Sequence, residues 1–286
     1  MLDIKFIREN PKLVQEAAKN KGIEIDINHL LEIDSKFREL QLEAQKIREE
    51  RNKLTDSIKG VPTGDQKETG KKLKEKLEKI EHAFKAVEEE LKTLLLIVPN
   101  IPAEDTPIGP DSKSNKEIRK WGEIPNFNFP VKNHIEIGNN LNILDFVAGA
   151  KASGFRGYYL KNDGASLHWA ILNFALMKMI SHGFTPMVPP TLIHEFVLQG
   201  SGHFPFGKQD VYQIVNAGKL ENGEEIKNPV FLGGTSEPSL LAYFADKTIS
   251  EEELPIKVCA LTQCYRSEVG DYGKDIKGLY RVHEFM

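Results

Sequence analysis

The chain contains few of the features on which secreted and membrane proteins depend. Only two cysteines occur in its 286 residues, Cys259 and Cys264, and their odd spacing puts them on opposite faces of a predicted strand. A local disulfide is therefore excluded, and a reducing compartment is favoured. The longest apolar run, residues 94–98, is far too short to cross a bilayer, and the first residues hold no apolar core of a signal peptide. We expect a cytoplasmic protein with no membrane partner and with both cysteines in or near the core.

An excess of charge and a metal-binding motif are missing as well. The formal net charge is -4, which does not mark the whole chain as a nucleic-acid-binding protein, so any contact with RNA must use local patches. The eight histidines show no ligand spacing, and His194-Glu195 lacks the second histidine of a zinc-binding helix. The sequence therefore predicts no zinc site.

The first third of the chain is rich in charge and has the spacing of helices. Asn10-Pro11 predicts a helix start, with Asn10 as the cap and proline in the first position, and Gly22 predicts its end. Two longer runs follow, in which the seam residues recur at alternating steps of three and four, broken only at Arg51. The two runs are Leu30, Ile33, Phe37, Leu40, Ala44, Ile47, Arg51, Leu54 and Ile58, then Leu73, Leu77, Ile80, Phe84, Val87, Leu91, Leu94 and Val98.

A connector over residues 60–66, rich in glycine and proline, separates these two runs. Two seams of similar length around a short turn predict an antiparallel coiled-coil hairpin, a projecting arm whose helices are each roughly 40 Å long. Its tip, residues 59–79, carries seven lysines against four acidic residues and could bind RNA phosphates. From the sequence alone, a solvated coiled-coil surface is the simpler interpretation of that patch.

The remaining two thirds of the chain differ from the first third in composition and in apolar pattern. Residues 99–130 hold six of the fifteen prolines and are predicted to form a stiff, irregular linker. From residue 131 to 286 the pattern is mixed α/β, and residues 166–180 show the spacing of an amphipathic helix. The side chains that this spacing predicts to be buried are Leu167, Ile171, Phe174 and Met177.

The end of the chain predicts a β-hairpin. Residues 258–265 favour a strand, residues 269–275 a turn, and the residues from Gly278 onward a returning strand. Because alternate side chains of a strand share a face, we expect one floor with two arginines and an aromatic ring, which suits phosphate and adenine. The side chains expected on that floor are Arg266, Glu268, Arg281, His283 and Phe285.

Several motifs of this region resemble one known family in their order along the chain. Thr235-Ser236-Glu237 resembles the serine-binding triplet of the seryl-tRNA synthetases, and the stretch from Arg266-Ser267-Glu268 to Phe285 resembles motif 2 of these class II enzymes. Residues 182–192 resemble their motif 1, and residues 200–206 resemble a further loop more loosely, with Phe206 where the family often has lysine.

The resemblance implies a serine--tRNA ligase that activates L-serine with ATP to seryl-adenylate and transfers serine to tRNA(Ser), with tRNA(Sec) as a further expected partner. Arg266 would contact the serine carboxylate and the α-phosphate, Arg281 the γ-phosphate, and Phe285 the adenine. The implied serine site is Thr235, Ser236, Glu237 and Arg266. The implied ATP site is Arg266, Ser267, Glu268, Arg281 and Phe285. Arg266, Glu268 and Arg281 are the implied catalytic residues, and Glu268 is the candidate Mg²⁺ ligand.

The fold class expected on these grounds is α+β. A coiled-coil hairpin (1–98) would serve as the tRNA-binding arm, followed by the linker (99–130) and by a class II antiparallel-sheet catalytic domain (131–286). The region from Gly183 to Leu192 would form a homodimer, and the loop over 269–277 would touch the tRNA acceptor end. The catalytic domain carries motifs 1 and 2 but no motif 3, so we expect a fragment with little or no aminoacylation activity of its own.

Two other interpretations stay open. A non-catalytic RNA-binding or coiled-coil protein derived from a synthetase would explain the missing motif, although such a scaffold has no need of a phosphate-binding arginine pair. An amino-acid:carrier-protein ligase would use the same chemistry, although it would not need the helical arm.

Overall fold

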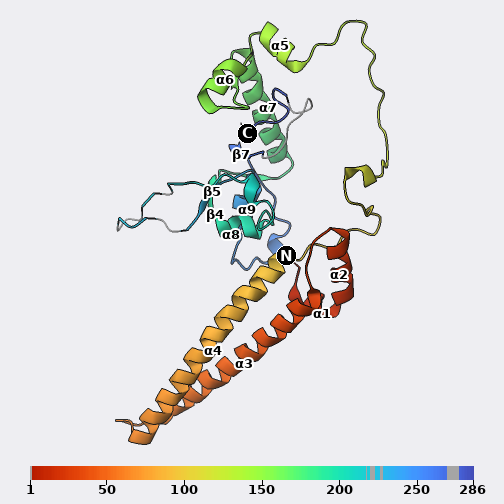
Figure 1. Ribbon diagram of the computed structural model, residues 1–286. Helices are drawn as coiled ribbons and strands as arrows, with labels where there is room; N and C mark the ends of the chain where they lie inside the picture. The colour runs from red at the N-terminus through yellow and green to blue at the C-terminus, as the bar shows by residue number, and fades with distance from the viewer. Residues whose placement is uncertain (1, 217, 220–222, 226–227, 269–276) are drawn as a thin grey trace. The chain divides into compact units, whose positions relative to one another are not determined.

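The computed structural model describes residues 2–216, 218–219, 223–225, 228–268 and 277–286, and it divides into two compact units, Met1–Trp121 and Gly122–Met286. Figure 1 shows the helices and strands of both units. In the described part of the chain, no helix is long and apolar enough to cross a membrane. The domain limits drawn from the sequence at residues 98 and 130 stay predictions.

The first unit consists of helices, and two of them form the predicted hairpin. Its elements are α1 (Ile4–Glu9), α2 (Pro11–Asn20), α3 (Ile27–Ser57), α4 (Gly64–Ile97) and the short turn η1 (Ser112–Ser114). Helices α3 and α4 run side by side for most of their length (Figure 1). With 31 and 34 residues, they are ~45–50 Å long, which is longer than expected.

The helix starts correct two expectations. Asn10 makes no capping hydrogen bond; its side chain donates to the carbonyl of Phe6 instead, and only the proline at the first helical position is as predicted. Helix α4 starts at Gly64, inside the predicted connector, because Thr63 and Gln66 form a capping box that satisfies first-turn N–H groups. The connector is therefore shorter than residues 60–66.

The seam between α3 and α4 is buried as predicted. Leu30, Ile47, Leu77 and Leu91 are all buried in it. Nearby, the rings of Phe37 and Phe84 meet with their centroids 4.8 Å apart. Each such buried aliphatic side chain contributes about 1.5–3 kcal/mol relative to an exposed one. The arm thus closes a core of its own.

A buried carboxylate joins the short first helix to this core. Asp34 of α3 is 1% exposed, and it accepts two hydrogen bonds of 2.7 Å from Arg8 of α1 and one of 3.2 Å from Arg38. The hydrogen bond from Arg8 to Asp34 raises the pKa of Arg8. The pairing explains how a charged residue can be buried beside the apolar seam, since a buried charge needs a partner.

The second unit is α+β, as predicted. Its helices and turns are α5 (His134–Asn140), α6 (Phe146–Ser153), α7 (Asp163–Ser181), α8 (Glu195–Gly200), η2 (Lys208–Asp210), α9 (Glu237–Tyr243) and η3 (Glu251–Glu253). Its strands are β1 (Leu144–Asp145), β2 (Tyr159–Leu160), β3 (Thr185–Met187), β4 (Leu192–His194), β5 (Val230–Leu232), β6 (Val258–Ala260), β7 (Cys264–Tyr265) and β8 (Glu284–Phe285). In the described residues they pair in twos: β1 with β2, β4 with β5 and β7 with β8 antiparallel, and β3 with β6 parallel.

The predicted hairpin at the end of the chain is shorter than expected. Residues 258–265 form two strands because β6 pairs with β3 and β7 pairs with β8, so the chain changes partner between them. Among the described residues from 277 onward, the returning strand is only β8, since the turn at Gly278 has a φ of +66° and residues 277–283 form no strand. Cys264 is buried, Cys259 is half-buried, and both are free thiols.

Helix α7 contradicts the burial that its spacing predicts. Leu167, Ile171, Phe174 and Met177 are exposed, with Phe174 at 71%. The spacing correctly predicts a helix, but no element of the described chain covers the face that it predicts to be buried. The buried cluster of this unit lies instead around α8, β4 and β5, and consists of Ile193, Val197, Leu198, Phe204 and Phe231.

Candidate functional site

Three segments distant in the sequence meet beside this cluster. They are the loop after β5 (residues 233–237), β7 with the residues that follow it (264–268), and β8 with the residues that precede it (281–285). The N–H of Tyr265 donates to the carbonyl of Gly233 at 3.0 Å, and the N–H of Arg266 donates to the carbonyl of His283 at 2.9 Å. Backbone hydrogen bonds therefore bring the two predicted triplets to one place.

Arg266 lies at the centre of this meeting point. Its Nε donates to the carbonyl of Gly234 at 3.2 Å, and its guanidinium carbon is 5.0 Å from the centroid of the Phe285 ring, within the range of a cation–π contact. A Cβ at Gly234 would be only 3.2 Å from the carbonyl oxygen of Tyr265, so glycine permits this approach. The arginine and the aromatic ring that the sequence predicted to share a floor are in contact.

Glu268 and Arg281 form an ion pair between their side chains, and Glu268 is the more buried of the two. Strand alternation does not place Arg266 and Glu268 on one face, because β7 ends at Tyr265 and Glu268 has a φ of +51°. The pair nevertheless brings residues from both sides of the hairpin together, as expected for a charged floor.

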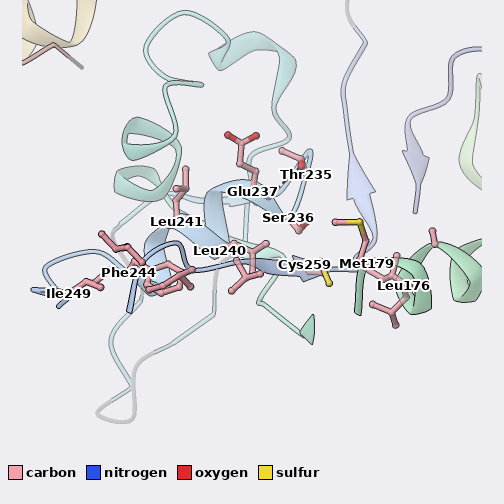
Figure 2. Close-up of a pocket in the computed structure, with 16 residues that line it drawn as sticks. Leu176, Met179, Thr235, Ser236, Glu237, Leu240, Leu241, Phe244, Ile249 and Cys259 are labelled. Carbon is pink, nitrogen blue, oxygen red and sulfur yellow. Dashed lines mark hydrogen bonds between the residues drawn. The ribbon is translucent and has the colours of Figure 1, made fainter. Parts of the chain in front are cut away.

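Thr235, Ser236 and Glu237 lie at the start of α9. The hydroxyl of Thr235 accepts a hydrogen bond of 3.4 Å from the N–H of Glu237. All three line a cavity of about 700 Å³ between α7, α9 and β6 (Figure 2). Most of its other lining side chains are apolar; Leu176, Met179, Leu240, Phe244, Ile249 and Cys259 are among them.

The triplet therefore places a few polar groups at the edge of a large apolar space. Figure 2 shows the Glu237 carboxylate and Thr235 together on one side, and Phe244 and Ile249 away from them. A small polar ligand can be recognised only at the polar edge, because the apolar remainder offers no hydrogen-bond partner.

Ser267 is held by a neighbouring loop. Its N–H donates to the carbonyl of Asp210 at 3.1 Å, and its hydroxyl donates to the carbonyl of Gln209 at 2.7 Å. The segment η2 thus fastens the residue next to Arg266. A contact of Ser267 with a nucleotide, implied by the resemblance, stays a prediction.

Tyr212 and His283 lie near Arg266 and contact each other, a pairing that the sequence did not predict. Nδ1 of His283 is 2.9 Å from the carbonyl oxygen of Arg266 and 3.1 Å from the hydroxyl of Tyr212. Burial is the main cause that raises the pKa of Tyr212, and it likewise raises that of Tyr158 and Tyr265. A second cavity, of about 470 Å³, lies here and is lined by Arg156, these three tyrosines, Gln263 and His283, among others. Tyr212 carries no sequence signal, since its role depends on contacts 71 residues away.

The described residues contain no cluster of three or more His, Cys, Asp or Glu that could hold a metal ion. Glu268 is a single carboxylate already engaged by Arg281, so it could give Mg²⁺ one ligand only, and bound phosphates would have to supply most of the others. The loop expected to touch the tRNA acceptor end falls outside the described residues at 269–276.

Comparison with known proteins gives two matching family models. One describes the seryl-tRNA synthetase N-terminal domain and matches residues 1–102. The other describes the tRNA synthetase class II core domain (G, H, P, S and T) and matches residues 219–286.

Similar proteins match along the whole chain. Serine--tRNA ligases from Deinococcus radiodurans and Borrelia garinii are 38% and 37% identical over 288 and 290 residues. Each match covers 100% of this chain and 65% of the relative, so the chain spans about two thirds of the length of its curated relatives.

Solved structures show the same similarity. The seryl-tRNA synthetase from Pyrococcus horikoshii complexed with ATP matches with a TM-score of 0.78 and 30% identity, over 100% of this chain and 68% of that one. The cytoplasmic serine-tRNA ligase from Naegleria fowleri in complex with AMP matches with a TM-score of 0.76 and 25% identity, over 100% and 65%.

Proposed function

This chain belongs to the seryl-tRNA synthetase family, and from that premise we propose that it is part of an enzyme that joins serine to tRNA(Ser) with ATP. The carboxylate of serine attacks the α-phosphorus of ATP, which forms seryl-adenylate and releases pyrophosphate. A hydroxyl of the terminal adenosine of the tRNA then takes the seryl group and releases AMP. A synthetase supplies positioning and charge for these steps rather than a covalent group of its own.

The observation that carries this proposal is the contact of Arg266 with Phe285, next to the Thr235–Glu237 triplet. A guanidinium beside an aromatic ring can hold the α-phosphate while adenine stacks on the ring. Since Arg266 is also bonded to the residue before Thr235, it can hold the serine carboxylate against the same phosphate. We assign Arg266 to both substrates and Phe285 to adenine.

The ion pair of Glu268 with Arg281 is the proposed site of the outer phosphates. Arg281 would bind the γ-phosphate, and Glu268 with Ser267 would complete the ATP site. When bound, Mg²⁺ would neutralise phosphate charge, with Glu268 as its candidate protein ligand. Because Glu268 already pairs with Arg281, the arriving phosphates would have to compete with the carboxylate for this arginine.

Thr235, Ser236 and Glu237 form the proposed serine site, at the polar edge of the apolar cavity. The carboxylate of Glu237 suits the ammonium or the hydroxyl of serine. A site that hydrogen-bonds a substrate hydroxyl can reject the analogue lacking it by about 10⁴-fold. Calorimetric titration should therefore detect serine and not alanine, and equal affinity for both would refute this assignment.

The helical arm is the proposed tRNA-binding element, for tRNA(Ser) and for tRNA(Sec). Of its tip lysines, Lys71, Lys72 and Lys74 pair with glutamates one turn away, which leaves the local charge modest. An arm of this kind recognises the shape of an RNA rather than its sequence. We further propose a cytoplasmic homodimer that forms through residues 183–192.

Activation of serine by the 286-residue polypeptide itself should be weak. The triplet borders an open apolar cavity and Glu237 itself is exposed, so water reaches the place where the substrates would meet. Serine-dependent exchange of pyrophosphate into ATP measures this step. Rapid exchange by the polypeptide would contradict the expectation of weak activity, whereas ATP binding without exchange would agree with it.

A non-catalytic RNA-binding protein is the second candidate, and the open cavity favours it. It predicts binding of tRNA without binding of ATP. The contact of Arg266 with Phe285 favours the enzyme, because a scaffold has no use for it. Measuring ATP and tRNA affinity on the same preparation distinguishes the two candidates.

A further inference from the structure

His134, the first residue of α5, contacts the far end of the motif 2 region. Its Nε2 accepts a hydrogen bond of 3.0 Å from the N–H of Leu279, a residue 145 positions later. Its ring also packs against the ring of Tyr280, with centroids 4.4 Å apart. These two contacts therefore tie the return segment to the start of α5.

The helix start fixes the position of the imidazole. Asn133 caps α5, with its side chain accepting from the N–H groups of Ile135 at 3.0 Å and Glu136 at 2.9 Å. The capping box is completed by Glu136, whose carboxylate accepts from the N–H of Asn133. A residue at the first position of a doubly capped helix has a well-defined backbone, which makes its side chain a good anchor.

The return segment is shaped to meet the imidazole. Gly278 has a φ of +66°, and a Cβ added there would lie 2.1 Å from Nε2 of His134 and 3.0 Å from Cγ1 of Ile135. Glycine is therefore required at this position both for the backbone conformation and for the close approach. Two independent features, the hydrogen bond and the glycine, bring the chain against His134.

The hydrogen bond also defines the state of the imidazole. Because Nε2 accepts from an N–H group, the ring proton must be on Nδ1. That Nδ1 is buried and has no hydrogen-bond partner among the described residues. The imidazole thus accepts a hydrogen bond from Leu279 and packs against the ring of Tyr280.

We propose that His134 is a positioning residue for the nucleotide site, which it serves by fixing the backbone at Leu279, two residues before Arg281. Arg281 makes its ion pair with Glu268 from this fixed segment. Without the acceptor, the N–H of Leu279 loses its partner, and the backbone that carries Arg281 is less well fixed, although the ion pair with Glu268 remains. The proposal rests on the proposed function, because it assigns Arg281 to ATP.

The test compares two substitutions, one that keeps a hydrogen-bond acceptor and one that does not. His134→Gln keeps an acceptor that can take the place of Nε2, whereas His134→Phe keeps the ring against Tyr280 and loses the acceptor. We expect roughly tenfold weaker ATP binding for His134→Phe, the loss expected when a half-buried donor loses its acceptor. We expect His134→Gln to stay close to the parent, and so does His194→Phe, a control at an exposed histidine of the same unit.

A second measurement, made without nucleotide, tests whether His134 protects the backbone N–H of Leu279. Amide hydrogen exchange at Leu279 should be faster in His134→Phe and unchanged in His134→Gln. Gly278→Ala should act like His134→Phe in both measurements, because its Cβ cannot fit against Nε2. Circular dichroism establishes that each variant is folded.

Three results would overturn the proposal: unchanged exchange at Leu279 in His134→Phe, unchanged ATP affinity in that variant, or equal losses in the Gln and Phe variants. If the parent protein binds no ATP, the proposed function fails instead. The exchange measurement would still decide whether His134 holds Leu279.

Discussion

The hairpin of α3 and α4 and the helix α7 both have apolar residues at helical spacing, but these residues are buried in the hairpin and exposed in α7. In the hairpin, Leu30 is 0% exposed, because α4 and the short helices α1 and α2 all contribute side chains to its cluster. In α7, Phe174 is 71% exposed, because nothing in the described chain covers that face. Periodicity therefore predicts which face of a helix is apolar, while burial also requires a partner element.

The two units also differ in how completely their apolar residues are covered. The arm completes its own core, as is seen from the buried Asp34 with its two arginines. The second unit places its polar triplet at the edge of an apolar cavity that stays open. We infer that the arm is stable by itself, and that the substrate site depends on whatever covers the cavity.

The largest expected effect comes from breaking the closed seam. Leu30→Ala should lower the free energy of unfolding of the arm by about 2–5 kcal/mol, since it leaves a cavity in a packed core. Phe174→Ala, the matched change on the open face of α7, should cost about 0.5 kcal/mol or less. Denaturation followed by circular dichroism measures both. Similar losses would mean that α7 is covered in solution.

The next largest effect should show that the two units bind different ligands. Arg266→Ala should weaken ATP binding roughly tenfold to a hundredfold, because it removes charge-assisted hydrogen bonds to phosphate. Its affinity for tRNA should hardly change, since the arm does not contain this residue. Arg119→Ala, at an exposed arginine, is the control for a lost positive charge. An equal loss of both affinities would argue against separate roles.

A smaller effect is expected at the tip of the arm. Replacing Lys67 and Lys79 by alanine should weaken tRNA(Ser) binding by about 1 kcal/mol and lower the slope of log affinity against log salt by ~1–2. Lys85 and Lys92, also exposed on α4, provide the matched pair of substitutions. A filter-binding assay over a range of salt concentrations gives both quantities. If the two pairs behave alike, the tip has no special part in binding.

The smallest effect should come from an ion pair across the hairpin. Arg48 and Glu81 approach to 2.8 Å, but both side chains are about half exposed. A double-mutant cycle should give a coupling of only about 0.2–1 kcal/mol, because water screens the charges. A coupling well above this range would show that this surface ion pair stabilises the arm in addition to the apolar seam.

The outcome at particular residues shows what a sequence can and cannot reveal. The two seams predicted the hairpin because each heptad position reports on a neighbour in the same short region. The start of α4 was predicted wrongly because a cap decides it. Residues 258–265 were predicted to form one strand and form two, because their pairing partners differ. In the site, the expected hairpin correctly predicted that Arg266 and Phe285 share a floor, although strand alternation does not extend to Glu268. No spacing could predict His134 or Tyr212, which contact residues 145 and 71 positions away.

The central claim is that the triplet at the start of α9 and the arginine–phenylalanine contact form one site for a seryl-adenylate. The most direct test is calorimetric titration with a stable seryl-adenylate analogue that carries a sulfamoyl group in place of the phosphate. We predict one saturable site per chain, with affinity above that for AMP or for the alanyl analogue. Equal affinity for the seryl and alanyl analogues, or no binding of either, would contradict it.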